Sequence, residues 1–444
     1  MQERAWVIVS VLFVASGCGD DREPAPAAAP SVTPPPAPAP PREMAITKTH
    51  PSSGTWGTEY TIEGKALSLA NEVTFETPAG EPLTVARNAK TVVTWGDGRI
   101  TVKVPFPADG KVTVGGLDAG TFASTFAVST SAFQRGSREP SEIMATGPDT
   151  VVVVATRNSS ASAIEPTLYR MHRDADAEEL PVTFQRAVLL RDETGPFAVL
   201  ETSTYVHARI ALEGDVAAPV AIADLPNERI VGSGSDATGP YVWMTSGTTV
   251  TRHRLAAGAW TPDRTVSGTS GSVRALAASD DGNLALFTTV QGGGLLDDYD
   301  VVYAQPAGAA DVAFGSTAAI VGDVDDSTFG YRVWAKDGGA TVVRFCATDE
   351  DGVPFDGRSC FTWAREPSAA AFARVDFLQH DGSGADAATA TCENDTLVVT
   401  SGTTKTPVMS PCRDVAAFAR GTDGRPVFLA GSRGKYLAVL PKPM

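Results

Sequence analysis

The chain has 444 residues, with 52 acidic and 36 basic side chains and a net charge of −16 at pH 7. This acidic balance argues against nucleic acid as a partner, because binding to phosphates needs clustered Lys and Arg. The chain is too long for one simple core, so two or more domains are expected.

The first 18 residues predict export. An uncharged stretch, Ala5–Gly17, follows Arg4 and ends in small residues directly before Cys18. A charged start, an apolar run and small residues at a cut site are typical of a secretory signal. The cysteine after them resembles the lipobox of bacterial lipoproteins, which implies that residues 1–18 are a lipoprotein signal peptide and that Cys18 carries lipid. An ordinary signal peptide or an uncleaved anchor is the alternative.

Residues 19–44 are rich in Pro and Ala and contain no aromatic residue. Such a sequence cannot bury a core and favours an extended chain, so it predicts a disordered, semi-rigid linker. At ~3.1 Å per residue, the linker would hold the folded part roughly 60–70 Å from the lipid. We therefore expect a bacterial cell envelope protein, and Gly19 after Cys18 resembles outer-membrane sorting.

Residues 45–130 contain several short runs in which apolar and polar residues alternate, as at 60–62, 100–104 and 112–114. Alternation with period two indicates half-buried strands, and several of them over this length suit a β-sandwich. The runs PSSGTWGTEYTIEGKAL, NEVTFETPAG, VVTWGDGRITVKVP and KVTVGG, with FAV at the end, resemble the IPT/TIG family. The resemblance implies an immunoglobulin-like sandwich and no particular activity. Trp56 and Trp95 are candidate ligand platforms, although we favour packing over the sandwich edge.

Residues 131–444 repeat one pattern, in which a glycine precedes a short apolar run, as in GPFAVLETS (195–203) and GPYVWMTSG (239–247). Seven copies have anchors separated by 45, 42, 43, 45, 52 and 45 residues, at Ile143, Val188, Ile230, Val273, Ala318, Ala370 and Val415. Four strands per copy at this period are typical of a β-propeller. The predicted fold class is therefore all-β, with a sandwich followed by a roughly seven-bladed propeller. A β-sandwich array or a β-helix is the second choice.

The seventh copy leaves no room for a fourth strand before Met444. We expect a strand from within Ser131–Arg138 to complete the last sheet, because closure removes an exposed edge. The resemblance to propellers concerns the architecture alone, so it supplies no site residues.

Four cysteines follow Cys18, namely Cys346, Cys360, Cys392 and Cys412. An even set in an exported chain predicts disulfides. Three pairings are possible, and we favour Cys346–Cys360 and Cys392–Cys412, because each would join a local hairpin. Zinc is less favoured, because the spacings are long and no histidine is close.

The motifs of common enzymes are absent from the sequence. It contains no GxSxG or HExxH string and no GxxxxGK[ST] loop, and we assign no catalytic residue. His172, His207 and His253 lie in the third run of successive copies, where we favour solvated strand residues over a site.

One acidic loop is a weak candidate for calcium, which prefers oxygen ligands. Its carboxylates are Asp349, Asp351 and Asp356 in DEDGVPFDG. Asp and Gly also favour ordinary surface turns, and we prefer that explanation. We therefore assign no metal site and no cofactor.

Together these features predict an envelope-anchored lipoprotein that is a non-enzymatic binding or scaffold module. Its expected partners are a membrane, through the N-terminal lipid, and a glycan, protein or cell-surface ligand. The alternative is an exported glycan-active hydrolase or lyase, because carboxylates drawn from different blades are not recognisable in sequence.

Overall fold

The computed structural model divides the chain into two units, Met1–Arg42 and Glu43–Met444. The structure describes residues 42–78, 80, 82–129, 133–134, 142–160, 163–173, 176–215, 217–266, 272–279, 284–291, 298–305, 316–319, 328–335, 341–347, 360–366, 373–375, 378–380, 388–394, 396–409, 412, 414–421, 423–432 and 435–442. The predicted signal peptide and most of the linker lie outside these residues.

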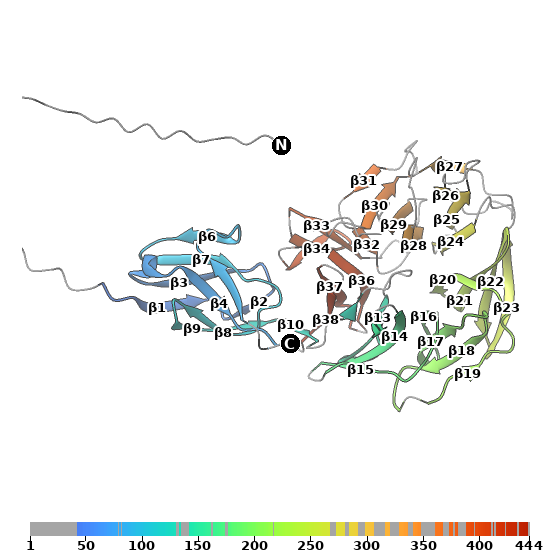
Figure 1. Cartoon of the computed structure of the whole chain (residues 1–444), viewed down its shortest axis with the longest axis horizontal. Helices are drawn as coiled ribbons and strands as arrows, with labels where there is room; N and C mark the ends of the chain where they lie inside the picture. Colours follow the sequence, from blue (N-terminus) through green and yellow to red (C-terminus); the bar gives the residue numbers. More distant parts are fainter. Residues whose placement is uncertain are drawn as a thin grey trace, which may run out of the picture. The chain divides into compact units, whose positions relative to one another are not determined.

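Strands make up the regular structure of the second unit (Figure 1). The described residues contain no α-helix, and their single 3₁₀ turn is η1, Leu67–Leu69. The all-β prediction is therefore confirmed for this part of the chain. Among the same residues no helix is long and apolar enough to span a membrane.

Two sheets form the first folded segment. One sheet has the strand order β1-β3-β7-β6, and the other has the order β2-β9-β8-β4-β5. Their bounds are β1 Ala45–His50, β2 Ser53–Gly54, β3 Glu59–Lys65, β4 Glu72–Phe75, β5 Leu83–Ala86, β6 Val92–Trp95, β7 Arg99–Lys103, β8 Gly110–Val114 and β9 Leu117–Ser124.

The two sheets face each other across one apolar layer. Tyr60 on β3 packs edge-on against Phe75 on β4 and Phe122 on β9, with ring centroids 5.9 and 6.1 Å apart. The Tyr60 hydroxyl donates a hydrogen bond to the carbonyl of Ala119 at 2.6 Å, so its polar end is satisfied inside the layer. Burial raises the pKa of this tyrosine, which therefore stays neutral.

Consecutive antiparallel sheets make up the rest of the unit, and five of them have four strands each. The first two are β16 Arg186–Asp192, β17 Gly195–Glu201, β18 His207–Ala211 and β19 Val220–Ala221, then β20 Arg229–Asp236, β21 Gly239–Ser246, β22 Thr249–Ala256 and β23 Ala259–Val266. The next two are β24 Ser272–Ala278, β25 Leu284–Gln291, β26 Asp298–Gln305 and β27 Ser316–Ala319, then β28 Thr328–Ala335, β29 Thr341–Ala347, β30 Cys360–Arg365 and β31 Ala373–Val375. The fifth is β32 Leu378–His380, β33 Thr389–Glu393, β34 Thr396–Ser401 and β35 Thr404–Met409.

A nine-stranded sheet contains both the start and the end of this part of the chain. Its strands are β10 Phe126–Val128, β11 Phe133–Gln134, β12 Glu142–Ala145, β13 Thr150–Ser160, β14 Ala163–His172, β15 Glu178–Glu179, β36 Asp414–Arg420, β37 Pro426–Ser432 and β38 Lys435–Pro441.

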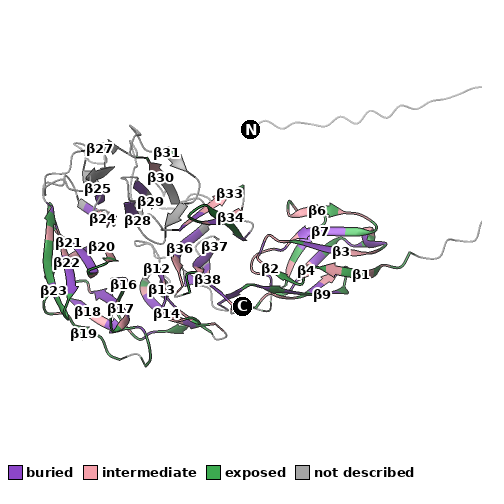
Figure 2. Cartoon of the chain, turned by 180° about the vertical axis from the view of Figure 1, so that it is seen from behind, coloured by how far each residue is buried: buried purple, intermediate pink, exposed green. Residues whose placement is uncertain are grey.

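The first strands of successive sheets contact one another. These contacts join β12 to β16, β16 to β20, β20 to β24 and β24 to β28, and also β32 to β36 and β36 to β12. Figure 2 colours central strands such as β17 and β21 as buried, and separate apolar clusters lie between neighbouring sheets. A succession of four-stranded sheets whose first strands meet, with the last beside the first, is propeller-like.

Strand β38 closes this succession. It pairs with β37 on one side and with β10 and β11 on the other, and β11 also pairs with β13. The expected closing strand within Ser131–Arg138 is thus present as β11, Phe133–Gln134. Phe126–Val128, which the sequence places at the end of the sandwich, instead pairs with β38.

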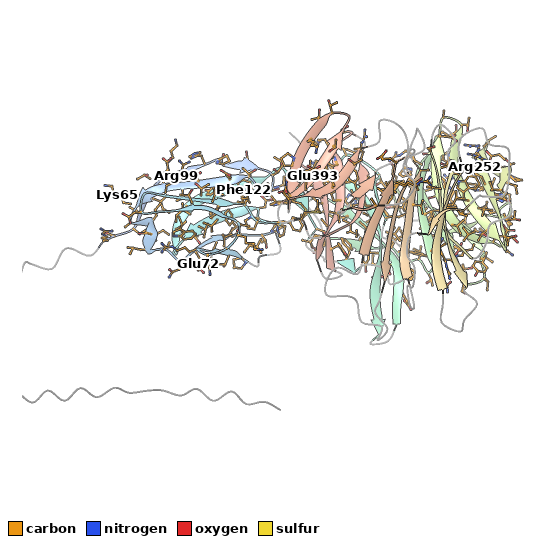
Figure 3. All side chains as sticks on the ribbon, turned by 90° about the horizontal axis from the view of Figure 1, so that it is seen from above. Lys65, Glu72, Arg99, Phe122, Arg252 and Glu393 are labelled. Carbon is orange, nitrogen blue, oxygen red and sulfur yellow. A yellow bond between two sulfur atoms is a disulfide. The ribbon has the colours of Figure 1, made fainter. Side chains whose placement is uncertain are left out.

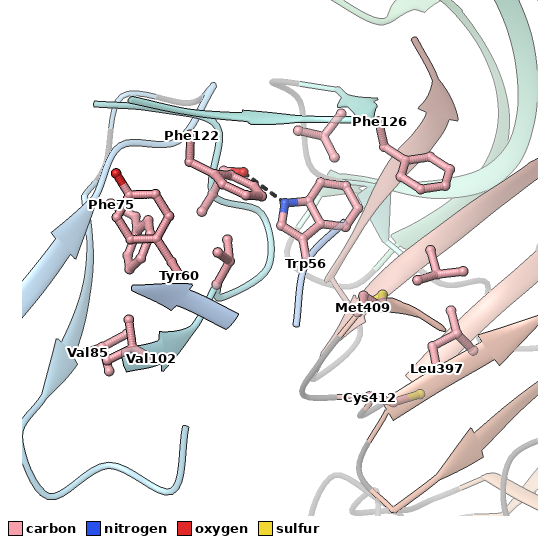
Figure 4. Packing of buried hydrophobic residues seen from close by; sticks show 14 of the residues in the cluster. Trp56, Tyr60, Phe75, Val85, Val102, Phe122, Phe126, Leu397, Met409 and Cys412 are labelled. Atoms are coloured by element: carbon pink, nitrogen blue, oxygen red, sulfur yellow. Dashed lines mark hydrogen bonds between the residues drawn. The ribbon is translucent and has the colours of Figure 1, made fainter. Parts of the chain in front are cut away.

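One apolar core joins the first segment to the last two sheets (Figure 4). Trp56 is 1% exposed, donates its indole N–H to the carbonyl of Ala108 at 2.9 Å and stacks on Phe126 at 5.7 Å. Phe126 in turn packs against Phe428 on β37 at 6.3 Å. The preference for packing over ligand binding at Trp56 is therefore confirmed. Two folded segments with one shared core are expected to move together.

Candidate functional site

Several residues singled out by the sequence lie outside the described residues. They are Cys18 and the calcium candidates Asp349, Asp351 and Asp356. In the part of the chain that the structure describes, no three His, Cys, Asp or Glu side chains are grouped to hold a metal ion.

Cys392 on β33 and Cys412 before β36 form a disulfide, as predicted, with Cα atoms 5.7 Å apart. The bond encloses β34 and β35, and Cys412 belongs to the core that contains Trp56. Cys346 and Cys360 are opposite each other in the register of β29 and β30. Their side chains are not among those described, so the second disulfide stays a prediction.

The histidines differ from the sequence expectation of solvated strand residues. His172 is exposed and hydrogen-bonds to the Thr150 hydroxyl at 2.9 Å, as expected. His207 and His253, however, are only 1% and 7% exposed. The expectation was wrong for these two, because both side chains face the layer between the sheets β16–β19 and β20–β23.

A turn of the form Asp-x-Thr-Gly is repeated in two successive sheets. In the first, the Asp192 carboxylate accepts hydrogen bonds from the backbone N–H and the hydroxyl of Thr194 at 2.9 and 2.7 Å. Asp236 holds Thr238 in the same way at 2.9 and 2.6 Å. The sequence analysis did not single out this turn, although the strings DETGP and DATGP showed it.

Arginines from the third strands bind these aspartates. Arg209 on β18 pairs with Asp192 at 2.8 Å, and its guanidinium stacks on Phe197 at 3.8 Å. Arg254 on β22 binds both carboxylate oxygens of Asp236, at 2.7 and 2.8 Å. It also contacts Asp263 at 2.7 Å.

Arg252, labelled in Figure 3, binds the same Asp263 at 2.7 and 2.8 Å. Burial alone would raise the pKa of Asp236, but hydrogen bonds from Arg254 and Thr238 outweigh it and lower the pKa to about 2. Burial alone would also raise the pKa of Asp263, but hydrogen bonds from Arg252 and Arg254 outweigh it and lower the pKa. Both carboxylates are therefore charged at neutral pH, and with Arg252 and Arg254 they form a structural ion network.

A second polar group lies between sheets β16–β19 and β20–β23. Glu201 is 3% exposed and accepts a hydrogen bond from the backbone N–H of Ile230 at 2.5 Å. Arg186, its register partner, donates to the carbonyl of the same residue. The Nε2 atom of His207 is 3.7 Å from the Glu201 carboxylate. Glu201 and Arg186 thus satisfy the backbone N–H and carbonyl of Ile230, on the first strand of the next sheet, and so connect the two sheets.

A pocket at the closing edge of the nine-stranded sheet is lined by residues that include Gly147, Pro148, Asp423 and Pro441. Asp423 is paired with Arg425 at 2.6 Å. Arg173 donates to the carbonyls of Pro148 and Pro441 at 3.0 and 2.9 Å. The charged groups here therefore hold the last strand in place.

The turn between β17 and β18, Thr202–Val206, presents apolar side chains to solvent. Tyr205 and Val206 are 42% and 43% exposed, and Tyr205 has a φ of 57°, in the left-handed region. Backbone bonds from Tyr205 N–H to Thr202 and from Thr202 N–H to Val206, each 3.0 Å, hold this conformation. An aromatic residue in this conformation costs of order 1–3 kcal/mol, which the local hydrogen bonds help to offset.

Comparisons with known proteins identify no family. No family model matches the chain, and no curated protein matches it. Among solved structures, a structural genomics protein of unknown function from Bacteroides thetaiotaomicron covers 90% of this chain and 99% of its own, with 14% identity and a TM-score of 0.36.

The WD40 domain of Toxoplasma gondii coronin covers 72% of this chain and 87% of its own, with 10% identity and a TM-score of 0.37. TolB from Acinetobacter baumannii covers 67% and 80%, with 13% identity and a TM-score of 0.31. Because these scores are below 0.5, the propeller-like description depends on the strand pairing above.

Proposed function

We propose that the chain is an exported bacterial lipoprotein, anchored to the outer membrane through Cys18, that acts as a non-enzymatic binding or scaffold module. In this proposal residues 45–130 are an IPT/TIG domain and residues 131–444 a seven-bladed propeller. The ligand is a glycan or a protein at the cell surface.

Seven sheets are proposed from the order of the strands. Five four-stranded sheets run from β16 to β35, and β12–β15 form a further set of four. The seventh is β36–β38, completed by β10 and β11, which pair with β38. The anchors in the sequence, 42 to 52 residues apart, support the same count.

The Cys392–Cys412 disulfide supports export. Structural disulfides persist in oxidising compartments and are rare in the cytosol of most organisms. The apolar stretch before Cys18 and the Pro- and Ala-rich linker agree with that compartment.

The observation that carries the binding proposal is the rigid, exposed turn Thr202–Val206. Hot spots of protein interfaces are enriched in Tyr, Trp and Arg, and a side chain fixed before binding loses little entropy. Tyr205 is an exposed aromatic residue of this kind, and hydrogen bonds hold its backbone, so less backbone entropy is lost on binding.

Labelled palmitate tests the anchor. Expressed in a bacterial host, the full chain is expected to incorporate label, and the Cys18→Ala chain is expected to incorporate none. A mature protein that keeps residues 1–17 would contradict the lipoprotein assignment.

A glycan array and photo-crosslinking at position 205 test the binding function with the full chain. We expect Tyr205→Ala to weaken binding by about tenfold or more. The matched control is Val93→Ala, which changes an exposed residue, 48% accessible, on β6 of the first segment. Equal binding by both variants contradicts the assignment of the turn, and cleavage of a bound glycan would favour the enzyme instead.

A further inference from the structure

Sheets β16–β19 and β20–β23 enclose two buried histidines, His207 and His253, which we call the histidine pair. Beside the polar side chains of Glu201 and Arg186, the layer between these sheets contains an apolar cluster of Val188, Leu190, Phe197, Val199, Leu225, Ile230, Val242, Met244, Leu255 and Trp260. His253 faces this layer because its register partner is Val242 and its strand neighbour on the same face is Leu255. His207 faces it from the opposite sheet, beside Glu201.

The ring nitrogens of the histidine pair are poorly satisfied. Among the residues that the structure describes, both nitrogens of His207 and Nδ1 of His253 are buried without a hydrogen-bond partner. A buried polar group without a partner costs about 1–3 kcal/mol. A cationic imidazole would cost more in the same place, because an apolar layer disfavours charge.

Charged side chains from three strands lie beside the pair: Arg209 on β18, on the same face as His207, stacks on Phe197 of this layer. Glu201 on β17 lies 3.7 Å from Nε2 of His207, but the same carboxylate oxygen binds the N–H of Ile230 on β20. Arg186 on β16 donates to the carbonyl of that residue. The Glu201 carboxylate is therefore already engaged with the first strand of the next sheet.

Burial and neighbouring charges shift the pKa of the His253 imidazole in opposite directions. Burial lowers the pKa of its imidazole most; Asp263 on β23 raises it, His207 lowers it, and Asp224 before β20 raises it. Asp263 is itself bound by Arg252 and Arg254, and Asp224 accepts the backbone N–H of Trp260 at 2.5 Å. Because these partners hold both carboxylates, neither is free to move and form an ion pair with protonated His253.

The pair is particular to this contact. In the preceding sheet the register position that matches His253 is Ile210, opposite Ala198. In the following sheet the position that matches His207 is Val250, opposite Thr245. Each histidine thus occupies a position that the neighbouring sheet fills with an aliphatic residue.

We infer that the histidine pair makes the contact between sheets β16–β19 and β20–β23 sensitive to acid: when His253 takes up a proton, the two sheets separate while the contact between β12–β15 and β16–β19 stays closed. The reason is the difference in the buried layers. The layer between β12–β15 and β16–β19 is an apolar cluster in which Ile210 stands at the matching position.

The direction of the pH effect follows from linkage. A histidine in an open chain gains its proton near pH ~6.5, and buried His253 gains it at a lower pH. Between these two values the open state binds more protons than the closed state. The contact therefore has its full stability above pH ~6.5 and loses it as the pH falls.

Hydrogen exchange of the full chain at pH 7.5 and 5.5, corrected for the intrinsic rate, tests the inference. Peptides that contain β18 and β20 are expected to open more at pH 5.5, by up to about tenfold per pH unit below ~6.5 for the protonation of His253. Peptides of β12–β13 are expected to change little. Equal opening of both regions, or opening of β12–β13 first, would overturn the inference from the wild-type chain alone.

Two variants assign the effect. His253→Ile copies the residue of the preceding sheet and is expected to flatten the pH dependence at β20. His172→Asn removes the exposed histidine of β14, the corresponding strand of the set β12–β15. This variant is expected to leave the pH dependence at β20 unchanged. A His253→Ile chain that is folded at pH 7.5 and keeps the wild-type pH dependence contradicts the role of His253.

Discussion

The sheets β16–β19 and β20–β23 have the same turn chemistry and different buried faces. In both, the turn from the first to the second strand reads Asp-x-Thr-Gly-Pro, and an arginine from the third strand binds the aspartate. Their faces differ because β16–β19 contributes Glu201 and His207 to a shared layer, where β20–β23 has Thr245 and Val250 at the same register positions. Turn chemistry is local and repeats, whereas a buried face is adapted to the neighbouring sheet.

Removing the buried carboxylate of Glu201 is expected to have the largest effect on stability among the changes that test the difference between these two sheets. Glu201→Ala leaves the N–H of Ile230 without its acceptor and Arg186 without the carboxylate beside it, so we expect a loss of about 3–5 kcal/mol in the free energy of unfolding. Thr245→Ala, at the same register position of the next sheet, is expected to cost about 1 kcal/mol. Urea unfolding of both variants measures the difference, and equal losses would show that Glu201 has no special role.

The arginines come next in expected effect. Arg254 binds two aspartates and its side chain is 11% exposed, so Arg254→Ala should cost about 2–3 kcal/mol. Arg209 binds one aspartate and is 30% exposed, so Arg209→Ala should cost about 1 kcal/mol. Thermal unfolding at low and high salt measures both; a larger loss for Arg209→Ala would reverse the ranking.

The turn glycines give a smaller contrast. Gly195 and Gly239 have φ values of 122° and 125°, which side-chain-bearing residues rarely adopt, so Ala should cost about 1–2 kcal/mol at either. A Cβ at Gly239 would meet the rigid carbonyl of Leu255 at 3.0 Å, whereas at Gly195 it would meet the flexible Glu213 carboxylate at 3.4 Å. We therefore expect Gly239→Ala to lower the melting temperature more than Gly195→Ala. The opposite order would contradict the steric role assigned to the Leu255 carbonyl.

The acid titration of Asp236 is the mildest test. Because its folded pKa is about 2, below the value of ~3.9 in open chains, its ion pairs stabilise the fold above pH ~4. That stability is lost as the pH falls from ~4 towards 2. Carboxyl chemical shifts measured by NMR report the pKa directly, and Arg254→Ala should move it upward. An unchanged value in that variant would assign the low pKa to Thr238 alone.

The parts of the fold that the sequence predicts are those with a local signal. The spacing of the glycine-led runs predicts the sheets, and the lack of a fourth strand in the last copy predicts a closing strand within Ser131–Arg138. The Cys392–Cys412 bond is predicted because the two cysteines flank a short hairpin segment. The candidate site is predicted less well: the repeated aspartate turn is visible as DETGP and DATGP, but no spacing rule links it to an arginine on a later strand.

Burial of the histidines is where sequence reasoning fails. His207 and His253 lie in third strands among arginines, a pattern that resembles a solvated strand as much as a covered one. Only the neighbouring sheet decides which side chains are covered. The same applies to Phe126–Val128, whose alternation marks a strand without saying that its partner is β38, about 310 residues further along the chain.

The sequence by itself determined that the folded part is made of strands and turns, because alternation and glycine placement act over a few residues. It also determined where a cysteine follows a signal-like stretch and where a disulfide is available. The tertiary structure decided which strand closes the last sheet, that the first segment shares the core of Trp56, Phe126 and Phe428, and that two histidines are enclosed together. These outcomes depend on contacts between residues far apart in the chain, whose free energy is gained only when the sheets pack.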